Sequence, residues 1–169
     1  MGQIFFKTYG SFTMVREILL AGVCLISLGS AASAAIVLNR GNDMDPSTLD
    51  QQLTTTVQED RVLKDLYEGL VAQDSHGRAV PGAATSWEIS PDGLTYTFHM
   101  RDNAKWSNGD PVTAGDFEFS FRRLMDPKTA AGYASVFYSI KNSEQIATGH
   151  IYVDQLGVKA LDDKTLQIT

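Results

Sequence analysis

The stretch WEISPDGLTYTFHMRDNAKWSNGDPVTAGDFEFSFRR, residues 87–123, decides the fold. Apolar and polar residues alternate in two short runs, 85–89, which starts two residues before the stretch, and 94–101, as in half-buried strands. Between the runs lies Ser-Pro-Asp-Gly at 90–93, where proline presets φ and glycine tolerates a positive φ. The stretch therefore predicts a β-hairpin with its apolar side chains facing inward.

A capped helix is expected directly after this hairpin. A second turn, Ser-Asn-Gly-Asp-Pro, occupies 107–111, and Thr113 is followed three residues later by Asp116, an acidic variant of the capping box. Four apolar side chains then share one helical face: Phe117, Phe121, Leu124 and Met125. The helix should end at Asp126, because a residue that precedes proline avoids the α region.

The rest of the chain predicts further helices and strands in alternation. We expect a strand at 36–40, a turn-rich segment at 41–50, a short helix at 143–148 and a hairpin at 156–168. A helix should follow the capping box formed by Thr56 and Glu59. Its apolar stripe would contain Val62, Leu63, Leu66, Tyr67 and Leu70. Loops are expected at Gly77 and at 81–82.

Charge and hydropathy argue against two classes of partner. The formal net charge of the 169 residues is −6 and no basic patch is evident, so we expect no nucleic acid partner. Beyond the N-terminal region the chain has no apolar run of about 20 residues, so no internal membrane span is expected.

Residues 1–34 predict an export signal. Met14 opens a short polar region, residues 18–28 form an apolar core, and Ala-Ser-Ala at 32–34 matches a cleavage site, so the mature chain would begin at Ala35. Residues 14–34 make a complete signal peptide alone, so we expect Met14 to be the true start. Part of a lipobox precedes Cys24, but Val23 intervenes, which argues against lipidation.

No pattern of catalytic or metal-binding residues stands out. Asp-Ser-His at 74–76 contains the residue types of a hydrolase triad, but a triad converges from separate elements rather than from one turn. His76, His99 and His150 lack the spacing of metal ligands, and the Asp162-Asp163 pair is typical of a turn. We expect no enzyme activity, no metal site and no cofactor.

Ordered segments across residues 36–169 resemble the bacterial extracellular solute-binding proteins of peptide-type ABC transporters, whose members include oligopeptide, dipeptide and nickel receptors. The matching segments are IVLNR (36–40), DLYEGL (65–70), PGAATSW (81–87), YTFHMR (96–101), AKWSNGDPVTA (104–114), Asp116-Phe117, Asp126-Pro127 and LGVKA (156–160).

This resemblance implies an α/β fold of the periplasmic-binding-protein type II-like class, in which two lobes close on a ligand. Residues 35–67 would contribute to the first lobe, and residues 68–169 would form most of a smaller second lobe. Such receptors are much longer than this chain, and the chain ends within a strand pattern. We therefore expect a truncated receptor whose remaining lobe sequence lies beyond Thr169.

The resemblance also implies three ligand-binding residues. Thr55 and Val57 would lie in the segment that hydrogen-bonds a peptide backbone, and Tyr133 matches a tyrosine of the cleft. Thr55 departs from the acidic residue that some relatives carry there. From the residues alone, Val57 could instead pack below a helix start and Tyr133 could be a core aromatic; Trp87 and Trp106 are interpreted as packing residues.

The expected function is capture of a peptide in the periplasm and its delivery to the permease and ATPase subunits of an ABC importer. The alternative is a truncated, non-functional remnant or one piece of a split gene, with a downstream chain supplying the missing lobe. A standalone interaction module has no positive sign in the sequence. The type of ligand, whether dipeptide, longer peptide or nickel chelate, is left open.

Overall fold

The structure, a computed structural model, describes Val37 and residues 39–169. The predicted signal segment, with its start at Met14 and cleavage before Ala35, lies outside the described residues. The chain divides into two units, Met1–Arg40 and Gly41–Thr169, and the named helices and strands lie in the second. Among the described residues, no helix has the length and apolar character needed to cross a membrane.

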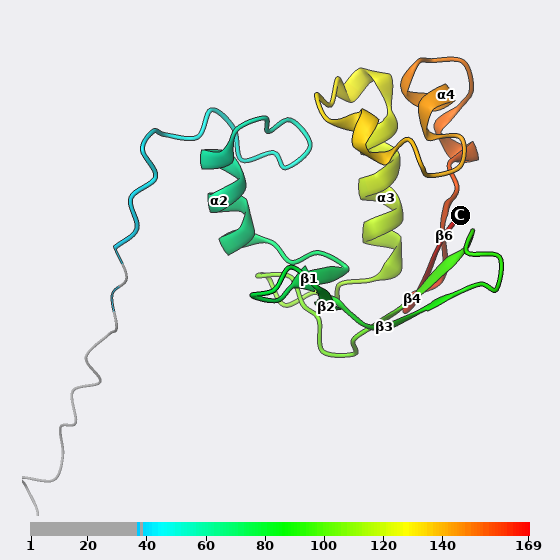
Figure 1. The fold of residues 1–169 in the computed structure, drawn as a ribbon, viewed down its shortest axis with the longest axis horizontal. Coiled ribbons are helices and arrows are strands. Elements are labelled where there is room, and N and C mark those ends of the chain that lie inside the picture. Colours follow the sequence, from blue (N-terminus) through cyan, green and yellow to red (C-terminus); the bar gives the residue numbers. More distant parts are fainter. Residues whose placement is uncertain (1–36, 38) are drawn as a thin grey trace, which may run out of the picture. The chain divides into compact units, whose positions relative to one another are not determined.

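In the second unit, α2 is followed by β1 to β4, then by the helices and turns from α3 to η3, and finally by β5 and β6 (Figure 1). The α-helices are α2 (Val57–Leu66), α3 (Ala114–Met125) and α4 (Ser143–Ala147), and the 3₁₀ turns are η1 (Pro127–Thr129), η2 (Ala134–Phe137) and η3 (Val153–Gln155). The strands are β1 (Val71–Gln73), β2 (Ala79–Pro81), β3 (Ala84–Ile89), β4 (Tyr96–Met100), β5 (Val158–Asp162) and β6 (Thr165–Ile168). They form a β1-β2 pair and a four-stranded antiparallel sheet of order β3-β4-β6-β5.

The predicted central hairpin is confirmed as β3 and β4. Trp87 lies opposite Phe98 and Ile89 opposite Tyr96 in the register of the two strands. At the turn, Gly93 has a φ of 74° and its N–H donates to the carbonyl of Ser90 at 2.8 Å. A positive φ of this size is one that glycine adopts without strain, which is why the turn closes at this residue.

The predicted capped helix is confirmed as α3. The Asp116 carboxylate accepts from the backbone N–H of Thr113 at 2.7 Å and from its hydroxyl at 3.0 Å. The helix ends at Met125, and Asp126, the residue before proline, is extended with a ψ of 121°. Both helix ends therefore lie where the local sequence places them.

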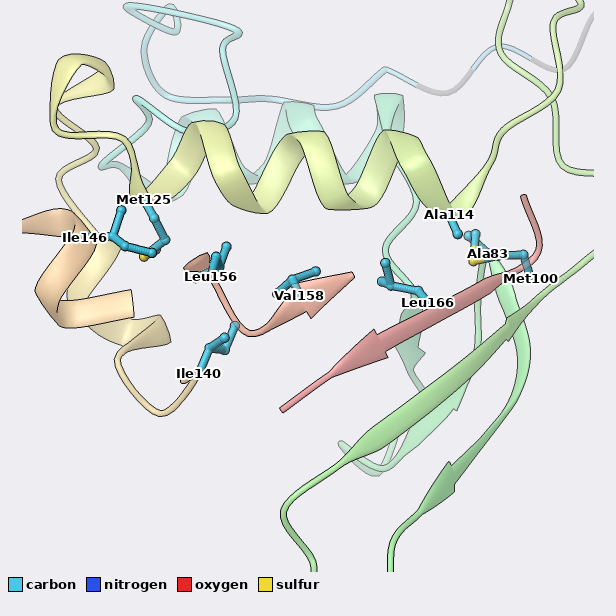
Figure 2. Close-up of a cluster of buried hydrophobic side chains, with 9 residues drawn as sticks. All are labelled: Ala83, Met100, Ala114, Met125, Ile140, Ile146, Leu156, Val158 and Leu166. Atoms are coloured by element: carbon cyan, nitrogen blue, oxygen red, sulfur yellow. The ribbon is translucent and has the colours of Figure 1, made fainter. Parts of the chain in front are cut away.

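The hydrophobic core lies between α3 and the sheet. Figure 2 shows the side chains of this cluster along the helix, the sheet and the turns that follow the helix: Ala83, Met100, Ala114, Met125, Ile140, Ile146, Leu156, Val158 and Leu166. Leu166 of β6 and Val158 of β5 are almost fully buried because α3 packs against these two strands. The far end of the β3–β4 hairpin extends past the helix, so Leu94 and Tyr96 are exposed rather than inward-facing as expected.

Three other expectations differ from the structure. Gly77 lies in a turn as expected, but the two strands that this turn joins, β1 and β2, were not predicted, and Pro81, expected in a loop, is the last residue of β2. The stripe on the first helix is wrong beyond Leu63: Leu66 and Tyr67 are exposed, and Leu70 lies after the helix has ended. No strand forms at the described residues of 36–40.

Candidate ligand-binding site

Two of the three predicted ligand-binding residues meet in the structure although 78 residues separate them. The Tyr133 hydroxyl donates to the backbone carbonyl of Thr55 at 3.3 Å. Next to it, a Cβ built on Gly132 would lie 3.2 Å from Cγ2 of Thr55, so the glycine allows the two segments to approach closely. Tyr133 is 55% exposed, so the interpretation of this residue as a core aromatic is wrong.

Val57 lies two residues after Thr55, at the first position of α2. Its side chain is 61% exposed, so it does not pack beneath the helix start. The three residues thus present a hydroxyl, an aromatic ring and a branched apolar group to solvent. Their contact with a ligand stays a prediction.

Glu59 holds the backbone that carries Thr55. One carboxylate oxygen accepts from the N–H of Ser47 at 3.1 Å and from the Ser47 hydroxyl. The other accepts from the N–H of Thr55 at 3.0 Å and from the N–H of Thr56 at 3.1 Å. These hydrogen bonds, first from the Ser47 hydroxyl and then from the Thr55 N–H, lower the pKa of Glu59 to about 2. The carboxylate is therefore charged across the physiological range.

Arg123 of α3 holds the segment at residues 50–52 against this helix. Its guanidinium donates to both oxygens of Asp50, at 2.9 and 2.5 Å, and to the side-chain carbonyl of Gln52 at 2.6 Å. The Gln52 amide in turn donates to the backbone carbonyl of Ser120 at 2.7 Å. The hydrogen bond from Arg123 holds the pKa of Asp50 below its usual 3.8. A two-pronged arginine–carboxylate pair of this kind fixes orientation as well as charge.

The sequence did not single out Glu59, Asp50, Gln52 or Arg123 as site residues. The capping box of Thr56 and Glu59 was visible as a local pattern. The contact of Glu59 with Ser47, 12 residues earlier in the chain, was not, because it depends on the path of the backbone between them. The pairing of Asp50 with Arg123 spans 73 residues and leaves no periodic signal in the chain.

The Asp-Ser-His residues at 74–76 contact one another: the Ser75 hydroxyl lies 3.3 Å from Nδ1 of His76, and an Asp74 carboxylate oxygen lies 4.0 Å from the same nitrogen. A hydrolase triad places serine and aspartate on opposite nitrogens of the imidazole, so this arrangement differs from one. Asp74 and His76 lie in the exposed β1–β2 turn, where the Asp74 carboxylate accepts from the Arg78 side chain at 2.8 Å. His99 lies with Nε2 3.6 Å from a Glu88 carboxylate oxygen on the polar sheet face. Among all the residues that the structure describes, no group of three or more His, Cys, Asp or Glu side chains is placed to hold a metal ion.

Comparisons with known proteins give a consistent match. The family model of bacterial extracellular solute-binding proteins, family 5, middle, matches residues 78–169, more than half of the chain. The periplasmic oligopeptide-binding protein OppA of Haemophilus influenzae is 49% identical over 135 residues, which cover 79% of this chain and 25% of the relative. The periplasmic murein peptide-binding protein MppA of Escherichia coli is 41% identical over 157 residues, covering 92% and 29%.

A solved structure agrees with these relatives. The crystal structure of Haemophilus influenzae OppA in complex with RPPGFSPFR matches with a TM-score of 0.72 at 50% identity, over 75% of this chain and 25% of that one. The expected periplasmic-binding-protein type II-like α/β class is thereby confirmed for a part of such a receptor. The chain spans about a quarter of the length of the curated relatives it matches. The division into lobes at residues 67 and 68 stays a prediction.

Proposed function

Because the chain belongs to the bacterial extracellular solute-binding proteins of family 5, we propose that it is part of a periplasmic receptor that captures peptides for an ABC importer. In this proposal the whole receptor binds peptide between two lobes and delivers it to the permease, while the ATPase subunits supply the energy. The chain contributes a binding surface and performs no chemistry.

The observation that carries the proposal is the match to a relative solved with a peptide bound, at 50% identity. The meeting of Thr55 with Tyr133 supports it, since it gathers an exposed tyrosine and an exposed backbone segment at one place. An exposed tyrosine beside an exposed stretch of chain is suited to contact a peptide, because its ring offers apolar area and its hydroxyl a hydrogen-bonding group.

The test is calorimetric titration of the purified chain with RPPGFSPFR, beside a Tyr133→Ala variant. Binding that weakens markedly in the variant supports the proposal and assigns Tyr133 to the site. Thr85→Ala is the control, because Thr85 is exposed on β3 and donates only to the carbonyl of His99. Equal binding by the wild type and Tyr133→Ala would remove Tyr133 from the site, and no binding by the wild type would show that this chain does not capture the peptide by itself.

We further propose that export removes residues 1–34 and that the mature chain begins at Ala35. Relatives that carry the word periplasmic in their names support the compartment. Intact mass of the chain recovered from the periplasm tests the position. A mature protein that retains residues before Ala35 would contradict it.

A second chain that supplies the rest of the receptor is the competing arrangement. The observation that favours it is the exposure of large apolar side chains along the first helix and after it, which include Leu66, Tyr67 and Val71. Surfaces of this kind commonly mark a protein contact. Co-expression with the polypeptide encoded directly downstream tests this arrangement: a stable complex that binds peptide when this chain alone does not would favour it, and no complex would contradict it.

A further inference from the structure

We propose that Glu59 is a positioning residue for the candidate site: its buried carboxylate fixes the backbone of Thr55 and, through Thr55, the place of the Tyr133 hydroxyl. This role rests on the proposed function, because Thr55 and Tyr133 are taken to contact the ligand. Glu59 itself is 2% exposed and has no access to a ligand in solvent. Its influence on binding therefore acts through the residues that it holds.

The hydrogen bonds of Glu59 join two separate stretches of backbone. Ser47 provides two donors and Thr55 and Thr56 provide one each, so one carboxylate closes the loop formed by residues 47–56. Four donors that converge on two oxygens require an acceptor at both positions. A glutamine has an acceptor at only one of them: its amide NH₂ would face either the N–H groups of Thr55 and Thr56, or the N–H of Ser47 beside a hydroxyl that can rotate to accept.

The same bonds determine which way Thr55 faces. Its N–H points to Glu59, inside the protein, while its carbonyl accepts from the Tyr133 hydroxyl. When the N–H is released, the peptide units on either side of Thr55 regain rotation, and the carbonyl no longer has a fixed direction. Loss of the carboxylate should therefore alter Tyr133, whose hydroxyl depends on that carbonyl.

A helix cap without any role in the site is the competing explanation, since Glu59 also caps α2. The chain offers a matched control in the cap of α3. There the Asp116 carboxylate accepts from the N–H and hydroxyl of Thr113, also three residues away. The Asp116 carboxylate bonds to Thr113 and makes no hydrogen bond to Thr55 or Tyr133. If Glu59 acts only as a helix cap, replacing it should affect Tyr133 no more than replacing Asp116 does.

The experiment compares Glu59→Gln and Asp116→Asn in the 169-residue chain by amide hydrogen exchange and by the NMR signals of the Tyr133 ring. We expect Glu59→Gln to speed exchange at Thr55 and Thr56 about tenfold, which corresponds to the loss of one hydrogen bond, and to shift the Tyr133 signals. Asp116→Asn should speed exchange at Thr113 and leave Tyr133 unchanged. Unchanged Tyr133 signals in Glu59→Gln, or equal shifts in both variants, would overturn the proposal.

A titration with RPPGFSPFR separates this role from the proposed function. If the wild type binds, Glu59→Gln should weaken Kd about tenfold and Asp116→Asn should not; an unchanged Kd in Glu59→Gln would overturn the positioning role. If the wild type does not bind, the proposed function fails for this chain, and the Tyr133 signals still decide the role of Glu59. Where Glu59→Gln does not fold, Ser47→Ala decides: Tyr133 signals that shift relative to the wild type support the role, and unchanged signals overturn it.

Discussion

Arg123 links two parts of the chain that local sequence patterns treat as unrelated. Its planar guanidinium donates to Asp50 and to Gln52 at once, a geometry that an ammonium group does not reproduce. We therefore predict that Arg123→Lys lowers the thermal midpoint by a few degrees although the charge is kept. Thermal unfolding followed by circular dichroism measures the effect.

The control for Arg123→Lys is Lys64→Ala. Lys64 pairs with Asp60 at 2.8 Å one turn away on α2, and both side chains are largely exposed, so its loss should have almost no effect on the midpoint. Equal midpoints in Arg123→Lys and the wild type would show that the contacts of Arg123 add no more than an ordinary surface ion pair.

Glu59 predicts a particular dependence of stability on pH. Because its pKa falls from 4.5 to about 2 on folding, the native state favours the charged form. The resulting stabilisation is complete above about pH 4.5 and is lost as the pH falls toward 2. Thermal midpoints measured from pH 7 to pH 2 should therefore fall less steeply below pH 4.5 in Glu59→Gln than in the wild type. Parallel curves would mean that Glu59 does not contribute to this acid sensitivity.

At the scale of elements, α3 packs against β5 and β6, and β6 lies between β4 and β5 in the sheet. Leu166 is fully buried between α3 and the sheet. Deleting its side chain leaves a cavity that the strands on either side prevent from closing, so Leu166→Ala should cost about 2–5 kcal/mol of unfolding free energy. Urea unfolding measures this quantity. Leu161→Ala, at a half-exposed position of β5, is the control and should change it little; similar losses in the two variants would contradict the core described above.

The elements that could be predicted from the sequence are those defined by local chemistry. The turn at 90–93, the cap of Thr113 and Asp116, and the stop before Pro127 each depend on residues a few positions apart. The β1–β2 hairpin escaped because each strand has three residues, too few to show alternation, and one of them contains Pro81. The predicted apolar stripe of the first helix was wrong for the opposite reason. Its apolar residues do recur at helical spacing, but beyond Leu63 no other element covers them.

The candidate site was predictable only in part for the same physical reason. Thr55, Val57 and Tyr133 were named because of a resemblance, whereas the contact of Thr55 with Tyr133 depends on the path of the backbone between them. Hydrogen bonds between residues that are distant in sequence, such as those of Glu59 with Ser47 and of Arg123 with Asp50, require no repeating pattern. Their partners can be recognised only once the fold has brought them together.

At the scale of the whole molecule, the exposed apolar surface predicts self-association. Phe119 on α3 is 68% exposed, and other large apolar side chains are exposed on separate elements, among them Leu66, Val136 and Tyr152. Because large apolar side chains gain free energy when another molecule removes them from water, we expect the purified chain to form larger species as its concentration rises. Light scattering coupled to size-exclusion chromatography measures this association.

The variant Phe119→Ser separates association through exposed apolar side chains from association caused by partial unfolding. Phe119 contributes to the exposed apolar surface and is outside the buried core cluster, so its replacement should reduce association and leave the thermal midpoint nearly unchanged. An association that instead arises from partial unfolding would increase as the midpoint falls, and Leu166→Ala would then associate most strongly while Phe119→Ser behaved like the wild type. A wild-type chain that is monodisperse at every concentration and melts in one cooperative step would show that its exposed apolar residues are tolerated without a partner.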